Sequence, residues 1–150
     1  MLIECMNLLH EDYHIDPKKI KVFNNRYLFV IYGLLKEFDI GYIKDAFYSR
    51  TKGTYRTGDD NILIFTYDLN GKRHALNTIA TFYHELRHYY QHNYKTNKFN
   101  LNSATLHMSE NGYNTQPHER DANRFASRMM NKHRKKLSEL TDTFNWNTTL

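Results

Sequence analysis

The sequence predicts a single α+β domain in which helices surround a small antiparallel sheet. Apolar residues recur at helical spacing toward both ends of the chain, and β-rich stretches alternate with turn residues between positions 46 and 68. The chain has only 6 glycines and 2 prolines, which favours helices over loops. Its 150 residues suffice to bury one core. We expect one domain over residues 1–140 and a loose tail over residues 141–150, with Trp146 as a docking candidate.

Two helices are expected before the sheet. Apolar residues recur every three or four positions over residues 2–12, and Asp16 followed by Pro17 prevents this helix from continuing. The same spacing predicts a second helix over residues 26–38. Both helices carry an apolar face for the core.

The sheet and the remaining helices follow from local composition. Three stretches favour strands, namely residues 46–48, 54–56 and 61–67, and the last is the most β-rich. A helix of about twenty residues is expected from Ala75. Pro117 begins a final helix that ends near Leu140.

The N-terminal sequence and the cysteine content indicate a cytoplasmic protein. Cys5 is the single cysteine and cannot form an intramolecular disulfide, as is typical of a reducing compartment. The N-terminal stretch lacks the basic segment of a signal peptide and carries Glu4 within its apolar part. The longest apolar run, residues 27–35, would cross about half of a bilayer. We therefore expect no membrane partner.

The stretch TFYHELRHYYQH, residues 81–92, contains a candidate metal motif. Side chains four positions apart on a helix share a face, so His84 and His88 can turn toward one ion. Glu85 borders that face and is placed to take a proton from a metal-activated water. Two neutral nitrogen ligands and one carboxylate base are the composition of a hydrolytic zinc site. His92 lies too far along the helix from His84 to join them.

The third ligand is expected on the last helix. Ala122 and Ala126 belong to its apolar face, and Glu119 in the first turn points the same way. A buried carboxylate is unfavourable without a cation, and a metal ion is such a partner. His118 also faces inward and is the rival ligand. Asn123 is expected to orient a histidine ligand through its other ring nitrogen.

Together these two segments resemble the ImmA/IrrE family of metallo-endopeptidases. The motif HELxH at residues 84–88 is followed at residues 119–126 by ExxANxFA, and the resemblance covers roughly residues 25–131. It implies a compact zincin-like domain, of the gluzincin kind, whose sheet packs on the HExxH helix between flanking helices. The chain departs from the family at residues 129–132, which read MMNK where the family ends in a pattern like LLMP.

The resemblance also implies roles for individual residues. It makes His84, His88 and Glu119 the ligands of a zinc ion, and it makes Glu85 the general base. A second departure is Arg87, which stands where the family usually has glycine.

Peptide hydrolysis usually needs a further group that stabilises the negative charge on the carbonyl oxygen. The sequence offers Tyr113, His118 and His107 and does not choose among them. The strand over residues 61–67, if it lies at the sheet edge, could pair with an extended substrate.

The function implied by the resemblance is site-specific cleavage of a regulatory protein by a cytoplasmic zinc endopeptidase. The substrate would be a transcriptional repressor, often of a phage or another mobile element. The alternative is a non-proteolytic, metal-stabilised antirepressor that acts by protein–protein contact.

A basic ridge on the last helix is a further candidate surface, and the chain carries a net charge of +5. It consists of Arg120, Arg124, Arg128 and Lys132, four positions apart, with Asp121 expected among these arginines on the outward side. Such a ridge is most often a solvated helix face. Otherwise it would contact an acidic protein surface or nucleic-acid phosphate.

Overall fold

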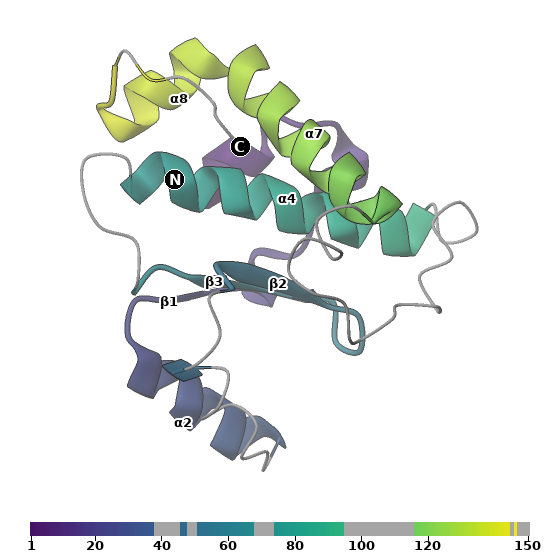
Figure 1. Cartoon of the computed structure of the whole chain (residues 1–150), viewed down its shortest axis with the longest axis vertical. Coiled ribbons are helices and arrows are strands. Elements are labelled where there is room, and N and C mark those ends of the chain that lie inside the picture. Colours follow the sequence, from purple (N-terminus) through teal and green to yellow (C-terminus); the bar gives the residue numbers. More distant parts are fainter. Residues whose placement is uncertain (38–45, 48–50, 68–73, 95–115, 145, 147–150) are drawn as a thin grey trace.

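The computed structural model describes residues 1–37, 46–47, 51–67, 74–94, 116–144 and 146. Helices cover both faces of a central sheet: α4 lies on one face with α7 and α8 above it, and α2 lies on the other (Figure 1). The elements are α1 (Leu2–Met6), η1 (Glu11–Tyr13), η2 (Pro17–Lys19), β1 (Ile20–Phe23), α2 (Arg26–Glu37), β2 (Gly53–Arg56), β3 (Asn61–Phe65), α4 (His74–Tyr94), α7 (Pro117–Lys132) and α8 (Arg134–Thr141). The α+β class predicted from the sequence is confirmed.

The sheet is mixed, which corrects the expectation of an antiparallel one. Its strand order is β1-β3-β2, with β1 parallel and β2 antiparallel to β3. β1 was not predicted from the sequence, because it has four residues and only Phe23 among them is buried. Ala46 and Phe47, expected in a strand, are helical.

β3 is the central strand, so the predicted strand at residues 61–67 does not lie at the sheet edge. All five residues of β3 are buried, which is typical of a strand covered on both faces. Its position leaves β2 as the edge strand nearest α4.

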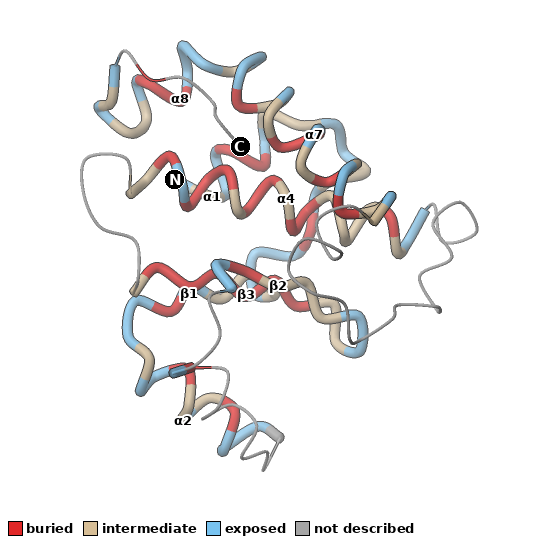
Figure 2. Tube along the Cα trace, viewed as in Figure 1, coloured by how far each residue is buried: buried red, intermediate tan, exposed pale blue. Residues whose placement is uncertain are grey.

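Helix α4 lies between the sheet and α7 (Figure 1). Its buried residues therefore occupy both sides of the helix, and Figure 2 shows burial concentrated in α4 and the sheet beneath it. Ile79, Phe82, Tyr83 and Leu86 are fully buried and join the main core. This double contact holds α4 firmly against both neighbours.

The N-terminal helix is shorter than the helix predicted over residues 2–12. Helix α1 ends at Met6, and a separate turn, η1, ends at Tyr13. The ring of Tyr13 stacks on Tyr90 at 4.7 Å and on Phe125 at 4.6 Å between ring centroids. Packing of Tyr13 on α4 and α7 thus places this segment, which local helix propensity does not foresee.

The last helix is divided, because the chain leaves helical geometry at His133 between α7 and α8. The tail expected to be loose is docked at Trp146, which is only 2% exposed. Its Nε1 donates a hydrogen bond to Ser138 Oγ at 2.9 Å. Arg134 lies 5.4 Å from the centroid of the Trp146 ring, within the range of a cation–π contact. Trp146 is therefore part of the core.

The outward face of α7 carries the predicted basic ridge. Its four members are exposed, and none of them forms an ion pair with another described residue: Arg120, Arg124, Arg128 and Lys132. Asp121 is not on this face but contacts α4. Within the described part of the chain, no helix combines the length and apolarity needed to cross a bilayer.

Trp146→Ala should destabilise the domain substantially. Truncation of a buried tryptophan leaves a cavity and typically lowers the free energy of unfolding by about 3–5 kcal/mol. Phe144→Ala is the matched control, because Phe144 is 64% exposed and its removal should change stability by less than about 0.5 kcal/mol. Urea unfolding followed by circular dichroism measures both. Equal losses in the two variants would contradict the docking of Trp146.

Candidate metal centre

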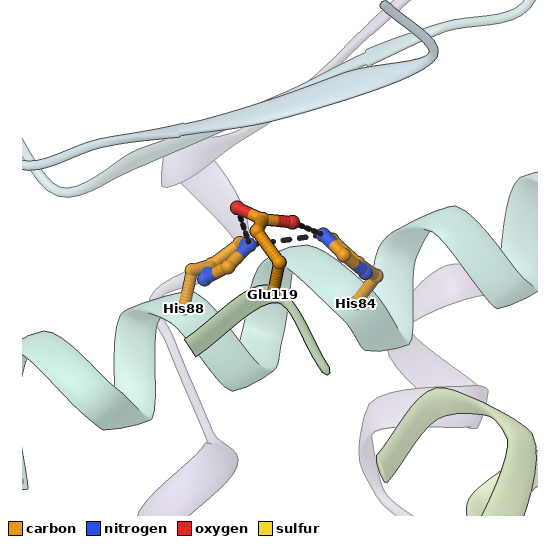
Figure 3. A group of neighbouring side chains, drawn as sticks. All are labelled: His84, His88 and Glu119. Carbon is orange, nitrogen blue, oxygen red and sulfur yellow. Dashed lines mark hydrogen bonds and ion pairs between the residues drawn. The ribbon is translucent and has the colours of Figure 1, made fainter. Parts of the chain in front are cut away.

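Two histidines of α4 and one glutamate of α7 meet at a single point. The Nε2 atoms of His84 and His88 lie 2.9 Å apart. Glu119 places one carboxylate oxygen 3.3 Å from His84 Nε2 and the other 3.3 Å from His88 Nε2 (Figure 3). The three candidate ligand atoms all lie within 4.8 Å of one another. The structure therefore brings together the three residues predicted as metal ligands.

Glu119 reaches this point because α7 packs closely on α4. Pro117 opens α7, and Glu119 lies in its first turn, where a carboxylate also suits the helix dipole. Ala122 and Ala126 are buried, and their small side chains allow the two helices to approach. Glu119 is only 2% exposed, as expected from its place on the apolar face.

The outer ring nitrogens of both histidines are held by amide oxygens. His84 Nδ1 lies 2.9 Å from Asn123 Oδ1, and His88 Nδ1 lies 2.9 Å from Gln91 Oε1. An amide oxygen only accepts, so each neutral imidazole carries its proton on Nδ1 and a lone pair on Nε2.

Three electron-rich groups then face one another: two Nε2 lone pairs and the Glu119 carboxylate. This arrangement is repulsive unless a cation lies between them. Imidazole nitrogen and carboxylate oxygen are usual zinc ligands, and three protein ligands leave a position for water or substrate. The donor set fits a divalent metal ion such as zinc.

The neighbouring carboxylates change the pKa of His88. Burial lowers its pKa, but the hydrogen bond to Glu119 and the charges of Glu85 and Glu119 outweigh burial and raise the pKa above its ordinary value. In the absence of a metal ion, protonation of His88 would therefore supply the positive charge that balances Glu119.

Glu85, the predicted general base, lies between α4 and the edge strand β2. It is 5% exposed, and burial raises its pKa, although the charges of His88 and His84 act in the opposite direction. The backbone N–H of Tyr55 donates to its carboxylate and also lowers the pKa. A carboxylate with a raised pKa beside a metal site suits proton transfer near neutral pH.

Gly53 is required for this approach of β2 to α4. A Cβ atom at Gly53 would lie 2.6 Å from Thr81 Cγ2 and 3.1 Å from both Cγ and Oε1 of Glu85. Any other residue would force the Thr81 side chain or the strand itself to shift. The strand thus comes close enough for its backbone to contact Glu85.

The outer edge of β2 presents backbone groups beside Glu85. Phe65 N–H donates to Lys52 O at 2.8 Å, so hydrogen-bonded pairs with β3 fall at alternate positions. Gly53 and Tyr55 therefore direct their N–H and C=O groups away from β3. Within the described residues, no strand pairs with this edge.

Of the candidates for stabilising the carbonyl oxygen, only His118 lies within the described residues. Its Nε2 is 3.5 Å from Glu119 Oε1, and its ring centroid is 5.9 Å from that of His88. Burial lowers the pKa of His118, and the charge of Glu119 opposes this effect. Tyr113 and His107 lie outside the described residues. His118 borders the cluster without belonging to the group of three.

The sequence placed His92 correctly and Asp121 incorrectly. His92 lies away from the cluster, as expected, with its Nδ1 3.3 Å from the Tyr55 hydroxyl. Asp121 does not face outward among the ridge arginines, which corrects the sequence-based placement. It pairs instead with Arg87, whose Nε donates to Asp121 Oδ2 at 2.7 Å.

The polar residues that surround His88 were not predicted from the sequence. Gln91 is fully buried and contacts both His88 and Asp121. Its position three residues after His88 on the same helix face was the available signal. The contact between Arg87 and Asp121 had no such signal, because it joins two different helices.

The fold and the cluster define an α+β domain with a candidate metal centre between two helices. The chain belongs to the DUF3920 family, which is described as a protein of unknown function and whose model matches residues 37–137. This match contains both helices of the centre. No curated protein and no solved structure matches the chain.

We predict one tightly bound zinc ion per chain. His84→Ala, His88→Ala and Glu119→Ala should each lose it, because each removes one of three ligands. His118→Ala is the matched control and should retain the metal. Elemental analysis of the purified variants measures this. Retention of zinc by Glu119→Ala together with its loss from His118→Ala would reverse the assignment of the third ligand.

The stabilisation provided by zinc should increase with pH. In metal-free protein the raised pKa of His88 means that its protonation stabilises the fold below the ordinary pKa, and this contribution is lost as pH rises through the folded-state pKa. The zinc-induced rise in melting temperature should therefore be larger at about pH 8 than at about pH 5.5. Differential scanning calorimetry with and without a chelator measures this. An equal or larger rise at the lower pH would contradict it.

Proposed function

We propose that this protein is a zinc-dependent, site-specific endopeptidase. The observation that carries the proposal is the convergence of two Nε2 lone pairs and one buried carboxylate beside a second, basic carboxylate. His84, His88 and Glu119 would hold the ion, and Glu85 would act as the base. The resemblance of these motifs to the ImmA/IrrE metallo-endopeptidases supports the same function.

A bound zinc ion would supply the positive charge that acidifies water and polarises a peptide carbonyl. Glu85 would accept the proton of the attacking water and return it to the leaving amine. The N–H of Tyr55 holds the Glu85 carboxylate at the edge of the sheet, so its orientation is fixed before substrate arrives. His118 is the described residue best placed to donate to the carbonyl oxygen.

We propose the edge of β2 as the place where substrate binds. An extended peptide adds to a sheet edge through main-chain hydrogen bonds. The N–H and C=O of Gly53 and the C=O of Tyr55 lie along this edge, and Glu85 lies directly beside them. β2 thus takes the role that the sequence had suggested for residues 61–67.

The substrate that the resemblance implies is a transcriptional repressor of a phage or another mobile element. The basic ridge on α7 begins one residue after Glu119 and would suit an acidic surface of that protein, or more weakly nucleic-acid phosphate. A cytoplasmic location agrees with the buried free thiol of Cys5, whose pKa burial raises to about 11, so that it stays an unreactive thiol.

A second candidate is a metal-stabilised antirepressor that acts by contact alone. One observation favours it: Glu85 is nearly enclosed between α4 and β2, with 5% of its surface exposed. A base that water could not reach would leave the metal with a structural role.

Glu85→Gln separates these two functions. The amide keeps the shape of the carboxylate but cannot accept the proton, so hydrolysis should fall by at least about 100-fold while zinc is retained. Glu139→Gln is the control, because Glu139 lies on the exposed face of α8. Each protein is co-expressed with a candidate repressor, and repressor fragments are measured by mass spectrometry.

The outcomes differ for the two candidates. Fragments with the wild type and with Glu139→Gln, but not with Glu85→Gln, are expected for the endopeptidase. Relief of repression by all three proteins without any fragment would favour the contact-only regulator.

A further inference from the structure

We propose that Gln91 is a positioning residue that fixes His88 as a metal ligand, and that Asp121 and Arg87 hold Gln91 in place. The inference rests on the metal centre of the proposed function but not on peptidase activity. No motif in the sequence assigns a role to Gln91.

The orientation of the Gln91 amide is determined by its three partners. Its Nε2 lies 2.9 Å from the backbone oxygen of His118 and 2.9 Å from Asp121 Oδ2. Both partners only accept hydrogen bonds, so they use both N–H groups of the amide. A flipped amide would set its oxygen against two acceptors. Gln91 Oε1 must therefore face His88.

This orientation of the Gln91 amide determines which tautomer of neutral His88 is present. Gln91 Oε1 lies 2.9 Å from His88 Nδ1 and can only accept, so Nδ1 carries the proton. The lone pair is then on Nε2, which faces Glu119 and His84. A hydrogen bond to the outer nitrogen also fixes the ring plane and makes the inner nitrogen a better metal ligand.

Asp121 is anchored in turn by Arg87. The guanidinium donates from Nε at 2.7 Å and from Nη2 at 3.3 Å to the two oxygens of the Asp121 carboxylate. The Cζ atom of Arg87 lies 4.8 Å from the ring centroid of Tyr90 and 5.2 Å from that of Phe125. Arg87 also donates from Nη1 to the hydroxyl of Tyr13.

The chain of contacts thus runs from η1 through α4 and α7 to the metal centre. It also accounts for arginine at position 87, because glycine there could neither hold Asp121 nor pack between the aromatic rings. The bulky side chain points into this contact rather than across the ligand set.

Gln91 could instead serve only as a buried polar link between α4 and α7. The two roles predict different consequences of a substitution. Loss of a polar link would lower stability alone, whereas loss of a positioning residue would also change the tautomer of His88 and the affinity for metal. Tyr83 provides the comparison, because its hydroxyl makes a buried hydrogen bond to Cys5 O from the same helix, away from the metal centre.

The test compares Gln91→Met, Gln91→Glu and Tyr83→Phe. Gln91→Met removes the acceptor of His88 Nδ1 and should weaken zinc binding roughly 10- to 100-fold in chelator competition. Gln91→Glu retains an acceptor but places a second carboxylate beside Asp121, so it should lower the melting temperature while keeping zinc affinity close to wild type. Tyr83→Phe should lower the melting temperature only.

A second measurement uses metal-free protein and does not depend on zinc binding. At a pH high enough for His88 to be neutral, nitrogen NMR of the histidine rings should report its single proton on Nδ1 in the wild type, and a mixture of the two neutral tautomers in Gln91→Met. If neutral His88 carries its proton on Nε2 in the wild type, or if Gln91→Met binds zinc as tightly as Tyr83→Phe does, the positioning role is wrong. If the wild type itself binds no zinc while His88 has its proton on Nδ1, the proposed metal function fails and the role of Gln91 in selecting that form stands.

Discussion

The structure depends on the contact between α4 and α7, where two imidazole nitrogens and a carboxylate converge without a proton donor of their own. Amide oxygens hold the outer nitrogens of His84 and His88, so the inner lone pairs face each other 2.9 Å apart. Glu119 adds a negative charge that is almost fully buried. Only a cation makes this contact favourable, so the packing of the two helices is energetically coupled to metal binding.

A second constraint comes from the sheet. Gly53 lets β2 approach α4 so closely that Glu85 accepts a hydrogen bond from the strand backbone. One helix therefore presents its metal-facing side to α7 and its base to the sheet edge. The two neighbours of α4 divide the proposed chemistry, with α7 completing the ligand set and β2 aligning both the base and an extended substrate.

The sequence predicted the parts of this centre that depend on local spacing. His84 and His88 share a helix face, and Glu119 lies on an apolar one, so the periodicity of two helices was enough to bring them together. Long-range contacts were not predictable in this way. Tyr13 packs between two helices, and Asp121 turns toward Arg87 because of a salt bridge across the helix pair. β1 likewise exists through pairing with β3, since its own pattern is weak.

The most direct measurement is a crystal structure of the zinc-loaded protein with anomalous diffraction recorded at the zinc absorption edge. We expect one anomalous peak between α4 and α7, about 2.0–2.2 Å from His84 Nε2, His88 Nε2 and a carboxylate oxygen of Glu119. Glu85 should lie beside the ion without binding it. A zinc-loaded crystal whose only anomalous peaks lie on the protein surface, with His84 and His88 turned away from Glu119, would contradict the metal centre.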